Sequence, residues 1–166
     1  MLGLGVMRLL VTVFIVASVA CTKPQPTAPA IDPNATVRFV TAPMDGVVST
    51  IMAAQLERSK TEHRRVLLYA GAPWCEPCRF FHEAVDRGEL TGTLGAVDLV
   101  AFDAQADAER MLLSGYESQF IPLFALPNPD GKASGRHIEG STKGPSAVGD
   151  DLVPRLKALL ADAKVQ

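Results

Sequence analysis

The stretch Val66–Arg79, with the sequence VLLYAGAPWCEPCR, carries the clearest structural signal in the chain. Its first five residues form an unbroken apolar run of strand length, which is typical of a central strand covered on both faces. Gly71-Ala72-Pro73 ends this run. From Cys75 to Arg87, apolar residues recur at helical spacing, at Phe80, Phe81, Ala84 and Val85. The stretch therefore predicts a buried strand, a turn, and a helix that begins near Cys75.

Strands and helices alternate on both sides of this stretch. Apolar runs predict further strands at residues 37–40, 97–102, 120–126 and 136–139. Helical spacing predicts further helices at residues 47–58, 106–116 and 147–163. Pro154 marks either the start of the last helix or a kink in it. This order predicts an α/β sandwich in which helices flank a mixed central sheet, within one domain that spans residues 37–166.

The composition fits a single globular domain. Of the 166 residues, 48% are apolar and 20% are charged, which is enough apolar material for a hydrophobic core. The 16 basic and 18 acidic residues give a formal net charge of -2. Because the chain has no excess of basic residues to bind phosphates, we expect no nucleic-acid partner.

Cys75 and Cys78 lie three residues apart at the predicted helix start, where two thiols can close a small disulfide loop. A Cys75 thiolate would face the unpaired amides and the positive end of the helix dipole, which favour the anion. We therefore expect Cys75 to be an exposed nucleophile. Cys78, inside the first turn, is expected to be more buried and to resolve a mixed disulfide. Pro77 suits the first turn, where its missing N–H has no partner to lose.

The segment Trp74–Cys78, on a strand-to-helix turn, resembles the active site of the thioredoxin superfamily. The resemblance covers roughly residues 37–163 and implies a thioredoxin-like three-layer sandwich. It implies a cis-proline at Ile121–Pro122, where the preceding backbone pairs with a bound substrate chain. Gly140, just after the last predicted strand, matches a third family position near this groove. The resemblance thus implies a substrate groove that comprises Trp74, Ile121, Pro122 and Gly140.

Three positions depart from the typical thioredoxin pattern. The buried carboxylate that relays protons in typical thioredoxins aligns with Tyr69, and its neighbouring lysine aligns with Leu99. Glu76-Pro77 replaces the Gly-Pro of the cytosolic proteins, which favours an extracytoplasmic member of the superfamily. We expect both residues to modulate the cysteines. The Glu76 carboxylate either disfavours the Cys75 thiolate, which makes the pair a better reductant, or points into water without effect.

The N-terminal residues predict export and lipid attachment. Residues 1–20 carry one charge, Arg8, before an apolar run that spans roughly 18 Å as a helix, too short for a lasting membrane span and suited to a signal peptide. The run ends in Ser18-Val19-Ala20-Cys21, which resembles the lipobox of bacterial lipoproteins and implies cleavage before Cys21 and acylation of its sulfur. The alternative is an ordinary secretory peptide with Cys21 as a spare thiol. Prolines predict a semi-extended spacer over residues 21–36.

These features together predict a lipid-anchored thiol:disulfide oxidoreductase in the cell envelope, which faces the periplasm or the exterior. It would use Cys75 and Cys78 to act on protein disulfides, with reduction favoured over oxidation. Expected partners are protein thiol or disulfide substrates and an electron donor of the membrane or envelope. Because the dithiol is itself the redox group, we expect no dissociable cofactor and no metal.

Alternatives remain open at this point. The cysteine pair could be a structural staple. Cys75, Cys78 and His82, with His137 as a fourth ligand, could bind a metal. The domain could also be a metallochaperone or binding module that presents its cysteines to copper or to a partner without turnover. His82 is either a polar residue on the helix flank or a proton carrier.

Overall fold

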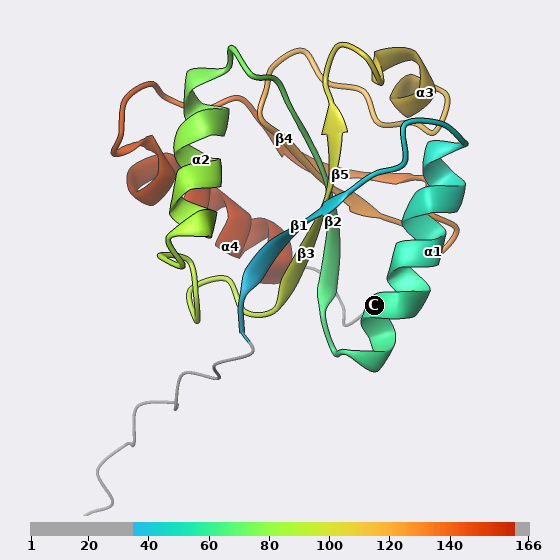
Figure 1. Ribbon diagram of the computed structural model, residues 1–166, viewed down its shortest axis with the longest axis horizontal. Helices are drawn as coiled ribbons and strands as arrows, with labels where there is room; N and C mark the ends of the chain where they lie inside the picture. The colour runs from blue at the N-terminus through green and yellow to red at the C-terminus, as the bar shows by residue number, and fades with distance from the viewer. Residues whose placement is uncertain (1–34, 162–166) are drawn as a thin grey trace, which may run out of the picture. The chain divides into compact units, whose positions relative to one another are not determined.

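The computed structural model describes residues 35–161. The strands are β1 (Val37–Thr41), β2 (Arg65–Gly71), β3 (Val97–Asp103), β4 (Leu123–Pro127) and β5 (Ala133–Glu139). The helices are α1 (Val48–Thr61), α2 (Glu76–Asp86), α3 (Ala108–Leu112) and α4 (Val153–Ala161), with a π-helical turn, η1 (Val148–Leu152), before α4 (Figure 1). The expected signal peptide, the lipidation site Cys21 and nearly all of the spacer lie outside the described residues.

β2 lies at the centre of a five-stranded mixed sheet with the strand order β1-β3-β2-β4-β5. β1 and β2 run parallel to β3, whereas β4 pairs antiparallel with β2, and β5 pairs antiparallel with β4. Every residue of β2 from Val66 to Gly71 is buried. The central position predicted from the apolar run is therefore confirmed, and so is the mixed α/β architecture.

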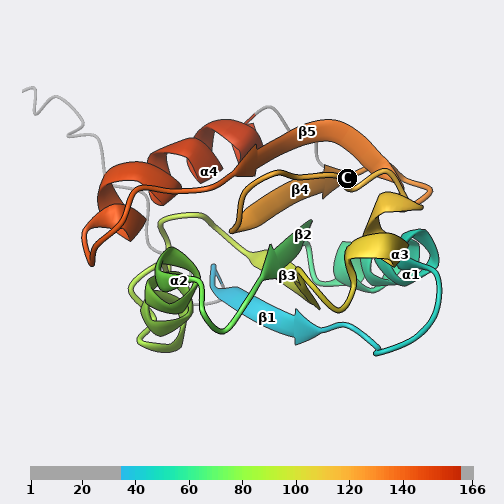
Figure 2. The ribbon, with the colours of Figure 1, turned by 90° about the horizontal axis from the view of Figure 1, so that it is seen from above.

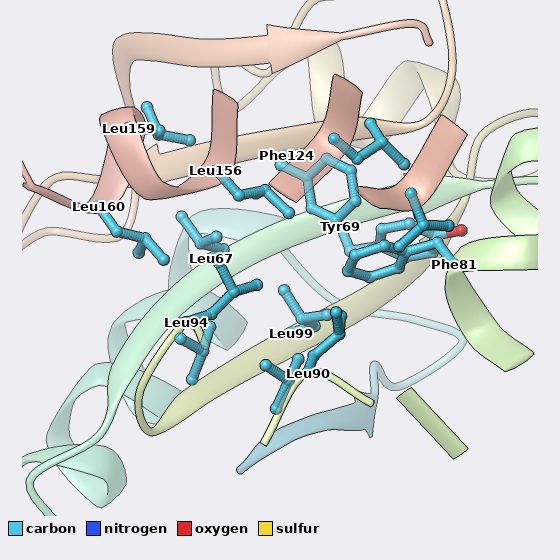
Figure 3. Packing of buried hydrophobic residues seen from close by; sticks show 14 of the residues in the cluster. Leu67, Tyr69, Phe81, Leu90, Leu94, Leu99, Phe124, Leu156, Leu159 and Leu160 are labelled. Carbon is cyan, nitrogen blue, oxygen red and sulfur yellow. The ribbon is translucent and has the colours of Figure 1, made fainter. Parts of the chain in front are cut away.

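Successive side chains of β2 point into two hydrophobic clusters, one on each face of the sheet. Leu67 and Tyr69 pack with Phe81 of α2 and with apolar side chains of α4 (Figure 3). Leu68 points to the other face and belongs to the cluster that contains Met52 of α1. Figure 2 shows the resulting layers, with α2 and α4 on one side of the sheet and α1 and α3 on the other.

Both strands of the C-terminal hairpin start at a different residue from the one predicted. β4 begins at Leu123 rather than at residue 120. Pro122 has no N–H to contribute to the sheet, so the ladder starts after it. β5 begins at Ala133 rather than at residue 136. Its side chains are partly buried or exposed along its whole length, so no apolar run marks its first residues.

Two helices are shorter than their apolar spacing predicts. α3 ends at Leu112 instead of near residue 116, and Gly115 soon after it has a φ of +83°, which departs from the helical path. The last predicted helix divides into η1 and α4. Pro154 lies at the start of α4, directly after the wider π-helical turn. Because proline has no N–H, it cannot donate to the carbonyl four residues earlier, and the regular helix starts here. None of the helices within residues 35–161 is long and apolar enough to cross a membrane.

A buried carboxylate joins β1, α1 and β3 at the end of the sheet opposite the cysteine turn. Asp98 is fully buried and accepts hydrogen bonds from Arg38, Arg64, Gln55 and Ser59. Burial alone would raise the pKa of Asp98, but hydrogen bonds from the two guanidinium groups and the hydroxyl outweigh it, so the net pKa is lowered. Both carboxylate oxygens are bonded, which satisfies the buried charge.

Candidate active site

The cysteine pair lies directly after the central strand. β2 ends at Gly71, and α2 begins at Glu76 with Cys75 as its N-cap (Figure 1). Cys75 and Cys78 form a disulfide, with their Cα atoms 5.2 Å apart. The strand, turn and helix predicted from the sequence of this stretch are therefore confirmed, and the two cysteines are close enough to be joined.

The first turn of α2 directs a helix amide at the Cys75 sulfur. The Cys78 N–H donates to Cys75 Sγ, with an N···S distance of 3.2 Å, and so takes the place of a polar N-cap interaction. Pro77 is buried in the same turn, where its missing N–H costs no helix hydrogen bond. The same amide and the positive end of the helix would stabilise a Cys75 thiolate after the disulfide is reduced.

The two cysteines are more evenly buried than we expected. Cys75 is 5% exposed and Cys78 is 2% exposed in the disulfide form. The order agrees with the expectation that Cys78 is the more buried residue, but Cys75 is not the exposed group that the sequence suggested. The reason is that the Cys75 side chain folds back over the first turn, toward the Cys78 N–H and Sγ.

Trp74 and Ile121 line one hollow beside the cysteine turn. The indole is 67% exposed, and its N–H donates to Gln105 Oε1 at 3.1 Å. The hollow has a volume of about 410 Å³ and extends to Leu112 and Met111 of α3. Two of the four residues of the expected groove thus share one mostly apolar surface. The contact between Gln105 and the indole was not predicted from the sequence.

Pro122 and Gly140 are joined by a backbone hydrogen bond. The Ile121–Pro122 peptide bond is cis, as the resemblance implies. The Gly140 N–H donates to the Pro122 carbonyl at 3.0 Å. Gly140 has a φ of +63°, and a Cβ at this position would lie 3.1 Å from the Cβ of Phe120, so glycine suits both the backbone and the space. Arg155 of α4 donates to the Gly140 carbonyl at 2.9 Å, a support that sequence reasoning missed.

The Glu76 side chain has a specific partner. Its carboxylate accepts a hydrogen bond of 2.9 Å from the Gly144 N–H, in the loop between β5 and η1. Neither of the two orientations considered from the sequence, toward the Cys75 thiolate or into water alone, includes this contact. The Glu76 side chain therefore connects the N-terminus of α2 to the loop that follows Gly140.

A second hollow, of about 460 Å³, lies beside Cys78 and is lined by Tyr69, His82 and Asp103 among others. Tyr69 is 2% exposed, and its hydroxyl has no hydrogen-bond partner among the described residues. Burial raises the pKa of Tyr69, so its phenol stays protonated. Tyr69 therefore contributes a neutral hydroxyl here, and Leu99 is buried in the same cluster.

His82 contacts two aromatic rings at the edge of this hollow. Its imidazole stacks on Phe39, with ring centroids 3.9 Å apart, and meets Tyr69 edge to face at 5.3 Å. Burial lowers the pKa of His82, and the nearby Asp86 carboxylate opposes part of that effect. The imidazole is therefore neutral at pH 7.

The residues considered as metal ligands are not gathered in one place. Within residues 35–161, no group of three or more His, Cys, Asp or Glu side chains is arranged to hold a metal ion. His82 lines the hollow beside Cys78, whereas His137 lines a different one beside β5.

Comparison with known proteins adds no assignment to this geometry. No protein-family model matches the sequence, and no curated protein matches it significantly.

Proposed function

We propose that the chain is a thioredoxin-like thiol:disulfide oxidoreductase that reduces protein disulfides in the cell envelope. The observation that carries the proposal is the Cys75–Cys78 disulfide at the start of α2, directly after the central strand of the sheet. The mixed sheet between two helical layers supports the thioredoxin-like assignment. The hydrogen bond from the Gly140 N–H to the Pro122 carbonyl lies directly before β4, the strand that pairs with β2. This hydrogen bond supports the implied substrate groove.

The reaction begins from the dithiol. The Cys75 thiolate attacks one sulfur of a substrate disulfide, so a Cys75–substrate disulfide forms and one substrate thiolate leaves. Cys78 then attacks Cys75 Sγ and releases the second substrate thiolate. Two electrons and two protons pass to the substrate, and the protein is left with the disulfide seen in the structure. An electron donor of the membrane or envelope must then reduce the disulfide.

The surface beside the cysteines supports a protein substrate. Trp74 and Ile121 line an open hollow that continues onto α3. An exposed indole held by Gln105 is a rigid apolar contact at low entropic cost. The family resemblance implies that an extended substrate chain pairs with the backbone beside Ile121–Pro122. The hollow would then accommodate an apolar side chain next to the substrate cysteine.

The anchor is part of the same proposal. Cleavage before Cys21 and acylation of its sulfur would hold the domain at a membrane, with residues 22–36 as the spacer. Stable attachment needs more than one acyl chain, because a single chain gives only marginal, reversible binding.

Single-cysteine variants test the proposal. Cys75→Ser is expected to abolish reduction of insulin disulfides by the dithiol form. Cys78→Ser is expected to lose turnover and to accumulate mixed disulfides at Cys75, which mass spectrometry locates. Partners trapped on Cys78 in Cys75→Ser, and not on Cys75, would reverse the assignment. Wild-type protein that binds zinc or copper tightly and reduces no disulfide would favour a metallochaperone instead.

A further inference from the structure

The hollow beside Cys78 contains an unpaired polar atom. The Tyr69 hydroxyl is buried and has no hydrogen-bond partner among residues 35–161. A buried hydroxyl without a hydrogen-bond partner costs free energy, and in folded proteins such groups often contact solvent or serve a function. A Cβ at Gly71 would collide with this hydroxyl, which places it next to the last residue of β2, at the base of the cysteine turn. Figure 3 shows the Tyr69 oxygen at the edge of the apolar cluster.

Cys78 and His82 lie one helical turn apart on α2, and both line this hollow. Residues four apart on a helix have Cβ atoms about 6 Å from one another, so the thiol and the imidazole share one face. The imidazole stacks on Phe39 and meets Tyr69 edge to face, and these two rings also contact each other. These ring contacts hold the partly buried imidazole at the hollow that Cys78 also lines.

The other charged groups around the hollow are poor bases. Asp103 accepts backbone N–H bonds from Ala106 and Gln105, which lower its pKa. Arg79 is a cation that pairs with Glu83 at 3.1 Å. Burial lowers the pKa of His82 overall, and Asp86 on α2 offsets part of this effect by favouring the imidazolium form. His82 is the group lining this hollow that can take a proton near pH 7.

We propose that His82 accepts the Cys78 thiol proton during resolution of the mixed disulfide and that Tyr69, a positioning residue, orders the solvent that carries it. This inference rests on the proposed oxidoreductase function. The Cys78 S–H bond breaks and its proton passes through the hollow to the imidazole. Cys78 Sγ bonds to Cys75 Sγ, the Cys75–substrate bond breaks, and the leaving substrate sulfur takes the electron pair. The substrate thiolate takes a proton from solvent, and the imidazolium releases its proton to solvent.

The test is a single-turnover reaction of the reduced full-length protein with insulin, stopped by acid and analysed by mass spectrometry. In His82→Gln, the mixed disulfide at Cys75 is expected to accumulate at pH 7, with resolution slowed at least about tenfold, because a general base contributes about 10² or more. At pH 9 hydroxide can take the thiol proton without the imidazole, so the difference from wild type is expected to shrink. Tyr69→Phe removes only the hydroxyl and is expected to show a smaller delay with the same pH trend.

A matched control and a second measurement complete the test. His137→Gln changes an exposed histidine in a different hollow and is expected to match wild type. If His82→Gln fails to fold, NMR titration of wild-type His82 replaces it, with different imidazole pKa values expected in the dithiol and disulfide forms. Resolution by a folded His82→Gln at the wild-type rate across the pH range would overturn the inference, and so would identical imidazole pKa values. Absence of any mixed disulfide in wild type and Cys78→Ser would instead refute the oxidoreductase function.

Discussion

The Glu76 carboxylate accepts a 2.9 Å hydrogen bond from the Gly144 N–H, although the two residues are 68 positions apart in the sequence. The contact joins the residue after the first cysteine to the loop that follows Gly140. Glu76 thus has two separable effects, a negative charge near Cys75 and a tether to the β5–η1 loop. The amide of a glutamine can still accept the Gly144 hydrogen bond, so Glu76→Gln removes only the charge, whereas Glu76→Ala removes both.

Glu76→Gln is expected to lower the pKa of the Cys75 thiol, because a nearby carboxylate disfavours the thiolate. Glu76 is exposed, so solvent screening keeps the change below about one pKa unit, which corresponds to less than roughly 30 mV toward oxidising behaviour. Titration of the thiolate absorbance measures it. Glu76→Ala is also expected to speed hydrogen exchange at the Gly144 amide, because its hydrogen bond is lost. Glu76→Gln is expected to leave that exchange rate unchanged. An unchanged or higher Cys75 pKa in Glu76→Gln would refute the electrostatic effect.

Asp98→Asn is expected to destabilise the fold by about 3 kcal/mol, because it removes the carboxylate that pairs with Arg38 and Arg64 in a buried site. Urea denaturation followed by circular dichroism measures the free energy of unfolding. Glu57→Gln breaks an exposed pair with Lys60 and serves as the control, with a change within about 0.5 kcal/mol. Equal stability of the two variants would show that the Asp98 network contributes little.

The same carboxylate predicts a dependence of stability on acid pH. The pKa of Asp98 in the folded protein is lowered below its ordinary value of 3.8. Its contribution is therefore fully present above pH 3.8 and is lost as the pH falls through the folded-state value. Thermal unfolding between pH 5 and pH 2 is expected to show a steeper loss of stability in wild type than in Asp98→Asn. Parallel curves would contradict this assignment.

Two glycines with the same backbone angle separate strain from close packing. Gly131 and Gly135 both have a φ of +78°, but a Cβ at Gly131 would collide with the Ser49 carbonyl, whereas Gly135 has open space. Gly135→Ala is expected to cost about 1 kcal/mol for the left-handed backbone alone. Gly131→Ala is expected to cost about 3 kcal/mol or more, because α1 must also shift. Similar losses of unfolding free energy in the two variants would mean that this turn adapts easily.

Cys21→Ser tests the proposed anchor. The variant is expected to keep the reductase activity of the folded domain but to move from the membrane fraction to the soluble fraction, or to remain unprocessed. Fractionation with immunodetection follows the protein, and mass spectrometry of the wild-type N-terminus reports acylation. Wild-type protein with an unmodified Cys21 and a mature N-terminus elsewhere would contradict the lipoprotein proposal.

Local sequence patterns predicted the centre of the molecule well. The apolar run of β2, the break at residues 71–73 and the spacing of the cysteines are properties of one short stretch, so the strand, turn and helix could be predicted together. The order of the apolar runs along the chain also predicted the mixed sheet. β5 was harder, because an edge strand with alternating partly buried positions has no continuous apolar signal.

Contacts between distant segments had no such signal. The Glu76–Gly144 hydrogen bond, the Arg155 bond to the Gly140 carbonyl and the stacking of His82 on Phe39 each depend on how separate elements pack. The burial of Cys75 likewise follows from the direction of its side chain over the first turn, which residue types alone do not specify.

The reduction potential of the Cys75–Cys78 pair shows whether this disulfide is redox-active. Equilibration of the protein with defined ratios of oxidised and reduced dithiothreitol, followed by alkylation and mass analysis, gives the fraction of disulfide. We predict a single two-electron transition at a potential above about −300 mV, the range of exchangeable protein disulfides. A disulfide that remains fully oxidised below about −300 mV would be a structural staple and would rule out the proposed exchange reaction.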